Sequence, residues 1–349
     1  MPRVRLQAAR AGRLVVMRWP LESLWRRTPA DAPPRIERAG AGRIASAAVP
    51  DRCLAQYHDY CLGLVRRTLS DESVPFDVVF GDLPPPPAFL PERTVRVGLQ
   101  CEHTLVKPGG RDADGAPAGG IPLPGSTGNY LVRIAGYDRL RRCDRVIDYS
   151  LPNLANIATC PRYADHLARS VHVAPLLAGE APAVQDGGRR DVVTTFTDSG
   201  QPRRSELLAR LAREGIAVRN VTGVYDEHDL VRLYGGAEVV VNVRQTDHHD
   251  TLEELRVLPA LLCGAIVVSE DVPLRSLVPY ERFIIWADYD RIPGAVRGAL
   301  ANAERLRRRI REDASFPETV AAMERANRRS IRAALHSPTA RIPLTGSNL

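Results

Sequence analysis

The second half of the chain alternates short apolar runs with amphipathic segments, which is typical of a parallel sheet with crossover helices. The predicted strands cover residues 192–197, 217–221, 238–243, 266–269 and 283–286. The predicted helices cover residues 203–214, 227–234, 252–263 and 292–312. Five strands at this spacing describe one doubly wound α/β domain.

The first half repeats these elements with longer interruptions. We expect strands at residues 14–18, 76–80, 95–100, 145–149 and 171–174, and helices at 51–69, 130–142, 152–158 and 162–168. A polar stretch rich in Gly, Ala and Pro then indicates a linker. The predicted division is a first Rossmann-like domain at 1–176, a linker at 177–190, a second Rossmann-like domain at 191–315, and a final helix and tail at 316–349.

Composition narrows the class of protein. Hydrophobic residues make up 44% of the 349 residues, and no run approaches the roughly 18 apolar residues of a membrane span. The start of the chain lacks the apolar core of a secretion signal. We therefore expect a cytoplasmic protein, with peripheral contact at the inner membrane face left open.

Charge and cysteine usage restrict the partners. The net charge of +7 comes mainly from arginines spread along the chain, which fits either a solvated surface or affinity for an anionic ligand or acidic membrane. Aromatic residues are 5% and do not interleave with basic ones, so no nucleic-acid partner is expected. The six cysteines form no CxxC pair, which indicates reduced core residues. The oligomeric state stays open.

Polar residues follow the predicted strand at 238–243 directly, and a helix begins behind them. Open α/β sheets bind ligands at the carboxyl ends of their strands. Arg244 and Arg256 are our candidates for a diphosphate clamp, because a guanidinium group matches two phosphate oxygens. For Arg256, a surface ion pair with Glu253 or Asp250 is the alternative.

Five further residues are candidates on the donor side. Thr251 and Glu254 fit a capping box, and Glu254 either only caps the helix or also faces the donor. His249 either bonds to a sugar hydroxyl or belongs to a solvated loop. Ser269 and Glu270 end the next strand, where the carboxylate either accepts ribose hydroxyls or caps a helix. We expect no metal site at 247–250, because adjacent loop residues seldom converge on one ion.

The first domain contributes the candidates for catalysis and acceptor binding. Glu102 and His103 follow a buried strand, where one of them is placed to act as general base; a hydrogen-bonded loop anchor is the alternative. Tyr149 and Asn153 lie at a strand-to-helix junction where acceptor contacts compete with ordinary N-capping. A long glycine-rich loop at 107–128 is expected to be a lid or disordered. Asn129 and Arg133 follow it, as residues that would hold it over an acceptor.

Two α/β units facing each other over a linker resemble the GT-B architecture of nucleotide-sugar-dependent glycosyltransferases over nearly the whole chain. The run of loop, Glu, helix, Gly, apolar strand and Ser-Glu in the second half is similar to their donor-binding segment. The Glu-x7-Glu pair of retaining families is replaced by Thr251 and Pro259. The segment at 254–256 is instead similar to the acid-then-base step of fucosyltransferase-like and exostosin-like enzymes.

This resemblance implies a glycosyltransferase that moves a sugar from a nucleotide-sugar co-substrate to a hydroxyl acceptor, with no cofactor required. The acceptor would be a glycan, a lipid-linked sugar or a small molecule, and surface polysaccharide or glycolipid assembly is the process that the fold suggests. Neither a GxxxxGK[ST] loop nor a GxSxG elbow occurs. A non-catalytic sugar- or anion-binding protein, and a nucleotide-sugar epimerase or hydrolase of the same fold, are the alternatives.

Overall fold

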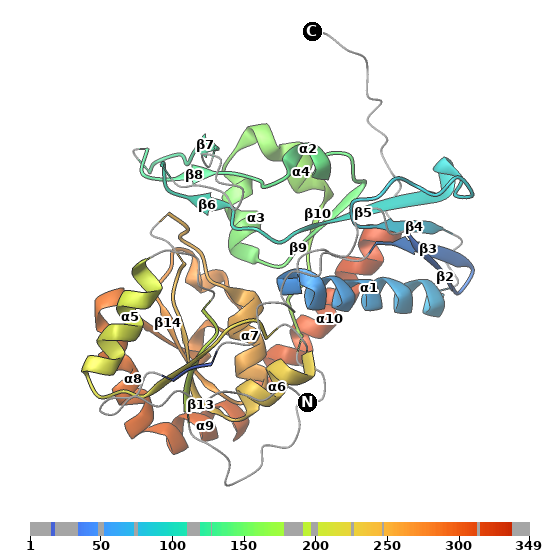
Figure 1. Ribbon diagram of the computed structural model, residues 1–349. Helices are drawn as coiled ribbons and strands as arrows, with labels where there is room; N and C mark the ends of the chain where they lie inside the picture. The colour runs from blue at the N-terminus through green and yellow to red at the C-terminus, as the bar shows by residue number, and fades with distance from the viewer. Residues whose placement is uncertain are drawn as a thin grey trace.

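The computed structural model of the chain contains two α/β domains that lie against each other (Figure 1). It describes residues 15–17, 34–47, 52–72, 76–109, 119–126, 128–177, 191–196, 202–224, 227–245, 248–312 and 315–336. The predicted fold class, two Rossmann-like units, is confirmed by two six-stranded sheets whose strands are mostly parallel. Most of the predicted linker lies outside the described residues, so the exact domain limits stay a prediction.

The C-terminal domain is built on a fully parallel sheet. Its strands, in spatial order, are β1 (Val15–Met17), β12 (Val218–Val221), β11 (Asp191–Thr194), β13 (Ala237–Asn242), β14 (Ile266–Glu270) and β15 (Ile284–Ala287). The helices are α5 (Pro202–Arg213), α6 (Glu227–Gly235), α7 (Glu254–Leu262), α8 (Ile292–Ala301) and α9 (Ala303–Glu312).

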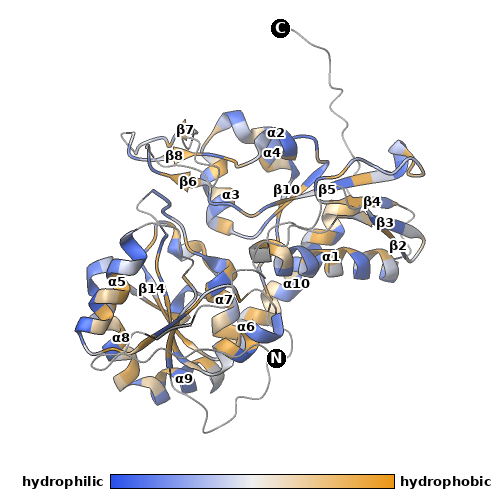
Figure 2. Cartoon of the chain, in the orientation of Figure 1, coloured by the Kyte–Doolittle hydropathy of each residue, from blue (hydrophilic) through white to orange (hydrophobic). Residues whose placement is uncertain are grey.

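Both faces of this sheet are covered, which is why its strands are continuous apolar runs rather than alternating ones. Val239 and Val241 face the helices α5 and α8, whereas Val240 faces α6 and α7. Figure 2 shows the same layering, with apolar residues on the strands and the inward faces of the helices. The central strands therefore hold fixed positions for the polar residues that follow them.

The N-terminal domain has a mixed sheet. Its strands, in spatial order, are β10 (Ser170–His172), β9 (Arg145–Asp148), β5 (Thr94–Gln100), β4 (Asp77–Phe80), β3 (Gly42–Ser46) and β2 (Arg35–Ala39), and only β2 and β3 are antiparallel. The helices are α1 (Arg52–Glu72), α2 (Tyr137–Leu140), α3 (Leu151–Ala158) and α4 (Ala164–Arg169).

Short 3-10 turns occur in both domains. In the N-terminal domain they are η2 (Pro91–Arg93) and η3 (Pro161–Tyr163), and in the C-terminal domain η4 (Arg275–Leu277), η5 (Glu281–Phe283) and η6 (Tyr289–Arg291).

The last helix, α10 (Ser315–His336), returns from the C-terminal domain and packs beside α1 and β10 of the N-terminal domain. Ile331 and Leu335 enter the core of that domain. Asn327 is fully buried, accepts a hydrogen bond from the Ala174 amide at 2.8 Å and donates to the Ala174 carbonyl at 2.8 Å. The end of the chain thus joins the two domains a second time.

Two predicted helices differ in the structure, and one predicted strand is found but belongs to the other sheet. The helix expected at 130–142 is instead strand β8 (Leu131–Val132) followed by α2, because β8 pairs with β6 (Leu105–Val106) and β7 (Ile121–Pro122) and Gly136 adopts a left-handed φ of 65° before α2. The strand at 14–18 is found at 15–17 but pairs with β12 of the other domain. The helix at 292–312 is interrupted at Asn302, which ends α8.

Two further observations concern the whole chain. No helix among the described residues is long and apolar enough to span a membrane. The structure describes the side chains of five cysteines, all with free thiols and four of them buried, which agrees with the expected reduced core residues.

Candidate functional site

The order of the parallel strands creates a topological switch point in the C-terminal domain. The chain crosses from β11 to β12 on one side and continues to β13 on the other, so the strand order reverses between β11 and β13. Ligands of open α/β sheets bind outside the carboxyl ends of the strands at such a switch point. Thr195 and Phe196 follow β11 there, and Val243 and Arg244 follow β13.

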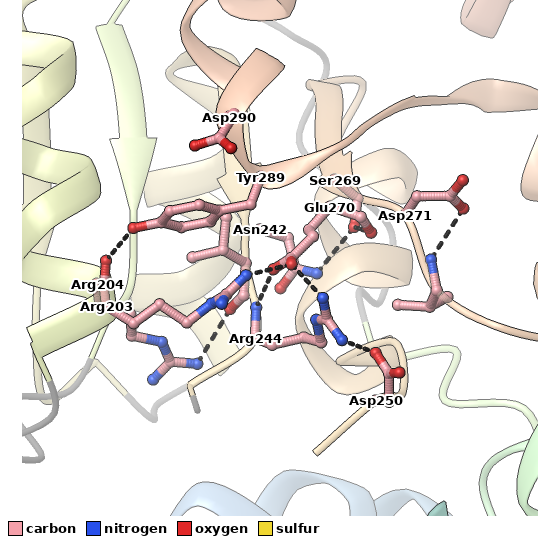
Figure 3. A network of polar contacts seen from close by, with 12 residues as sticks. Arg203, Arg204, Asn242, Arg244, Asp250, Ser269, Glu270, Asp271, Tyr289 and Asp290 are labelled. Carbon is pink, nitrogen blue, oxygen red and sulfur yellow. Dashed lines mark hydrogen bonds and ion pairs between the residues drawn. The ribbon is translucent and has the colours of Figure 1, made fainter. Parts of the chain in front are cut away.

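Two arginines gather at this edge of the sheet (Figure 3). Arg244 forms ion pairs with Asp250 and Glu270, and its amide donates to Glu270 Oε2 at 3.2 Å. Arg203, in the first turn of α5, pairs with the same Glu270 and has its guanidinium 4.0 Å from the centroid of the Tyr289 ring. Glu270 ends β14 with only 2% exposure, so it anchors both guanidinium groups rigidly.

The structure agrees with the predicted position of Arg244, whereas the predicted ribose contact of Glu270 competes with its ion pairs. Arg244 lies where the sequence placed it, directly behind β13 and in reach of a ligand at the switch point. The carboxylate of Glu270 already accepts bonds from Arg203 and from Arg244. A ribose hydroxyl could bind Glu270 only by replacing one of these contacts.

Arg256 lies beside this switch point, in contact with a residue that follows β11 and with one that ends β13. Its Nε donates to Thr195 Oγ1 at 2.8 Å and its Nη1 to Asn242 Oδ1 at 2.8 Å. Asn242 in turn donates to Ser269 Oγ at 3.0 Å, and Ser269 is fully buried. Arg256 is therefore fixed by neutral partners, and Ser269 supports it from within the domain rather than facing a ligand.

The capping box predicted for Thr251 and Glu254 is wrong. α7 begins at Glu254, with Glu253 at the N-cap position and no side-chain capping bond. Thr251 lies further from the helix because its loop is attached to the other domain. Glu254 points into the interface, where its Oε2 accepts a hydrogen bond from Tyr280 at 2.9 Å.

The two domains are joined by backbone pairing along a seam formed by residues 103–107 and 248–254. Val106 and His249 form an isolated antiparallel bridge. The Lys107 amide donates to the His248 carbonyl at 2.6 Å, and the Asp250 amide donates to the Leu105 carbonyl at 3.3 Å. Tyr130 adds a hydroxyl bond to Asp250 Oδ2 at 2.5 Å. Residues on both sides of the glycine-rich loop thus contact the segment 248–250 of the C-terminal domain, which lies between β13 and α7.

His103 lies inside this seam. Its Nε2 is 3.4 Å from Glu253 Oε1, and its Nδ1 is 3.2 Å from the Tyr149 hydroxyl. Burial acts to raise the pKa of Glu253, but the hydrogen bond and charge of His103 and the charges of Arg256 and Arg204 bring the pKa well below its ordinary value. Glu253 is therefore an anion that holds the imidazole in place.

His249 faces His103 with 5.7 Å between the ring centroids. Burial, followed by the positive charges of His103 and Arg133, lowers the pKa of His249 to about 4. His249 is consequently neutral near pH 7 and can both donate and accept a hydrogen bond. This is the property that a contact with a sugar hydroxyl needs.

Asn153 positions the loop that carries the catalytic candidates. It is fully buried, accepts from the Thr104 amide at 3.2 Å and hydroxyl at 3.0 Å, and donates to the Glu102 carbonyl at 3.2 Å and to Asp148 Oδ1 at 3.1 Å. Ser150 N-caps α3, as the alternative interpretation of this junction predicted. An acceptor could bind Asn153 only at the expense of these bonds.

The remaining candidates differ in exposure. Tyr149 is 2% exposed and contacts His103, so it supports the seam. Arg133 is buried; burial lowers its pKa, and the negative charge of Glu102 opposes that shift. Glu102 and Asn129 are exposed. Of the two candidates for catalysis, Glu102 is therefore the one whose side chain is exposed to solvent.

Sequence reasoning missed three residues of this region: Arg203, Lys107 and Asp148. Arg203 and Lys107 approach the arginine cluster from α5 and from the seam. Asp148 is a buried carboxyl group at the interface, as is Glu254, which the sequence offered as a cap or a donor contact; burial raises the pKa of Asp148 to about 8 and that of Glu254 to about 7. Arg203 could have been found, because it begins the helix that follows a central strand.

A metal site is not formed by the described residues, since no three His, Cys, Asp or Glu side chains among them come together. Asp247, part of the segment that invited this interpretation, lies outside the described residues.

The described residues thus form two Rossmann-like domains that meet along a seam, with arginines at the carboxyl edge of one sheet. No protein-family model matches the chain, and no curated protein matches its sequence. Among solved structures it is similar to an alpha-glucosyltransferase in complex with UDP and a 13-mer DNA containing an HMU base, at 10% identity and a TM-score of 0.31, over 78% of this chain and 80% of that one. At this level of similarity, no conclusion about the fold, the donor or the acceptor of this chain follows from the match.

Proposed function

We propose that this protein is a glycosyltransferase that transfers a sugar from a nucleotide-sugar donor to a hydroxyl group of an acceptor. The donor binds the C-terminal domain at the switch point between β11 and β13. The acceptor approaches from the N-terminal domain. Surface polysaccharide or glycolipid assembly is the process in which we would look for the acceptor first.

The observation that carries this proposal is the pair of arginines held by Glu270 at the carboxyl edge of the sheet. Arg203 comes from the first turn of α5 and Arg244 from the loop after β13, and the two converge on one buried carboxylate. Guanidinium groups fixed in this way can bind a diphosphate in two-pronged geometry without reorganising. A site of this kind fits a ligand whose diphosphate becomes a leaving group.

The chemistry requires two kinds of group. The bond between the anomeric carbon and the diphosphate oxygen breaks as the acceptor oxygen attacks, so negative charge develops on the leaving diphosphate and is stabilised by Arg203 and Arg244. The acceptor hydroxyl loses its proton to a general base. We assign this role to Glu102, which is exposed, and a positioning role to His103, whose two ring nitrogens are both engaged.

Thermal-shift measurements with UDP, GDP, CDP, CMP and dTDP test the donor site, followed by mass spectrometry of reactions with the matching nucleotide sugars. We expect one nucleoside diphosphate to stabilise the protein, and Arg244→Gln to weaken its binding about tenfold or more. Arg328→Gln is the matched control, because Arg328 is exposed on α10 and forms its ion pair with Glu324, away from the switch point. If none of these nucleotides binds and no nucleotide sugar is consumed, the proposal is wrong.

The same reactions separate the alternatives. Ligand binding without turnover, unchanged in Glu102→Gln, would identify a non-catalytic binding protein. Release of a free isomerised or hydrolysed sugar without any acceptor product would identify an epimerase or hydrolase.

A further inference from the structure

Lys107 is the sole lysine of the chain. The sequence contains 48 lysine and arginine residues, and every one of them except Lys107 is an arginine. An ammonium group is a compact point charge on a flexible stem, whereas a guanidinium group is planar and rigid, so the two are not interchangeable. The contacts of this single lysine can therefore differ in kind from those of the arginines around it.

The backbone of Lys107 is held at the seam between the domains. It directly follows β6, and its amide donates to the His248 carbonyl at 2.6 Å. The neighbouring Val106 forms the bridge with His249. Although Lys107 belongs to the N-terminal domain, its position is therefore set by the loop that follows β13 in the other domain.

The side chain of Lys107 extends toward the arginine cluster. Its Nζ lies 5.7 Å from the centroid of the Tyr130 ring, and the Tyr130 hydroxyl donates to Asp250. Asp250 in turn pairs with Arg244, which shares Glu270 with Arg203. A continuous set of contacts thus connects Lys107 of the N-terminal domain with Arg244 and Arg203 of the C-terminal domain.

The charges in this set do not balance. Arg203 and Arg244 are paired with carboxylates, whereas the Lys107 ammonium has no ion-pair partner within the part of the chain that the structure describes. Partial burial, and then the positive charges of Arg244 and Arg203, lower the pKa of Lys107, and Glu270 opposes this effect. An anion placed between the three cations would relieve this repulsion.

We propose that Lys107 is the third cation of the diphosphate site and reaches it across the seam from the N-terminal domain. The diphosphate of the donor is then bound between Lys107 on one side and Arg203 and Arg244 on the other. The nature of the ligand rests on the proposed function, whereas the composite anion site rests on the contacts of this chain. Because both domains contribute cations, ligand binding also stabilises their closed arrangement.

Amine acetylation of the intact wild-type protein tests this inference without any substitution. Lys107 carries the only ε-amine, so peptide mass spectrometry reports its modification rate directly, and the α-amine at the N-terminus is an internal reference. Saturating inorganic pyrophosphate is expected to slow acetylation of Lys107 about tenfold and to leave the α-amine unaffected. Sodium chloride at equal ionic strength is the control for screening.

Calorimetric titration with pyrophosphate provides the second measurement. We expect Lys107→Gln to weaken pyrophosphate binding about tenfold and Lys107→Arg to retain most of the affinity, since a charged group is restored. Circular dichroism and thermal melting check that both variants fold.

Two outcomes overturn the inference: pyrophosphate fails to bind the wild-type protein, or it binds while Lys107 stays as reactive as before. A different result addresses the proposed function separately. If pyrophosphate protects Lys107 but no nucleotide sugar is turned over, the result supports the anion site and contradicts the proposed glycosyl transfer. If Lys107→Gln transfers sugar with unchanged KM and kcat, the result supports glycosyl transfer and contradicts the role of Lys107 in binding the diphosphate.

Discussion

At the scale of single residues, the site depends on buried polar side chains that hold the candidate residues in position. Asn153 alone connects the Glu102 carbonyl, Thr104 and Asp148. In the other domain Glu270 performs the same task for Arg203 and Arg244. A buried polar group that loses its partners keeps the full cost of desolvation, so such residues contribute more than exposed ones of the same type.

Replacement of Asn153 by alanine is expected to lower the free energy of unfolding by about 2–4 kcal/mol, because the Thr104 amide and the Glu102 carbonyl lose a buried partner. Urea denaturation measures this change. Asn129→Ala is the matched control, since Asn129 is exposed and its substitution should alter stability by less than about 0.5 kcal/mol. Equal effects of the two substitutions would show that the Asn153 bonds do not hold the loop.

At the scale of elements, close packing sets how the secondary structure meets around the site. Gly98 in β5 lies under α2 and the turn after it, and a Cβ atom added there would be 2.8 Å from Cys143 Sγ and 3.0 Å from Leu140 Cδ2. The strand therefore needs a residue without a side chain if the polypeptide above it is to approach this closely. β5 leads directly into the loop of Glu102 and His103.

Gly98→Ala is expected to destabilise the protein by about 1–3 kcal/mol through overpacking. The double variant Gly98→Ala, Cys143→Ala should recover part of this loss, because removal of the sulfur makes room for the added methyl group. Gly63→Ala is the control: Gly63 lies within α1 and no atom is within 4 Å of an added Cβ, so that change should stabilise by about 0.5–1 kcal/mol. Urea titrations of the wild-type protein, Gly98→Ala, Cys143→Ala, the double variant and Gly63→Ala measure these changes, and additive effects of Gly98→Ala and Cys143→Ala would contradict the proposed contact.

At the scale of the whole molecule, the interface between the domains buries carboxyl groups from both sides. Asp148 ends β9 of the N-terminal domain with no exposure, and Glu254 begins α7 of the C-terminal domain with 2% exposure. Burial is the main cause that raises the pKa of Asp148 to about 8 and that of Glu254 to about 7. The closed interface therefore favours the protonated forms, and separation of the domains favours the ionised ones.

Stability is accordingly expected to fall as pH rises. Both pKa values are higher in the folded protein than in the unfolded chain, so the folded state binds more protons, and its advantage is lost as pH passes through about 7 to 8. Between pH 6 and pH 9 the free energy of unfolding should decrease by about 1–4 kcal/mol. Glu254→Gln should flatten this dependence, whereas Glu324→Gln, at an exposed carboxylate on α10, should not. Thermal unfolding across this pH range checks the prediction, and identical profiles for the two variants would refute it.

Local pattern was sufficient for much of the fold. Continuous apolar runs such as 238–243 indicated strands buried on both faces, and their regular spacing indicated crossover helices, so the doubly wound C-terminal domain could be predicted. The position of Arg244 behind a central strand followed from the same pattern. The hairpin of β2 and β3 was not predicted, and the helix expected at 130–142 failed because its first residues pair with β6 instead.

Amino-acid order alone was thus enough for most elements of the C-terminal domain and for the fold class of two Rossmann-like units, because burial periodicity and strand direction are properties of neighbouring residues. The domain limits and the edge of the sheet that binds a ligand stay predictions. Packing in three dimensions settled which side chains meet there. Glu270 could be recognised as an anchor for Arg203, 67 positions away, only once the C-terminal domain was folded. His103 could be recognised as a partner of Glu253, 150 positions away, only once the two domains were in contact. Hydrogen bonds and ion pairs act over a few ångströms in space, so residues that are distant along the chain reveal their partners only in the folded molecule.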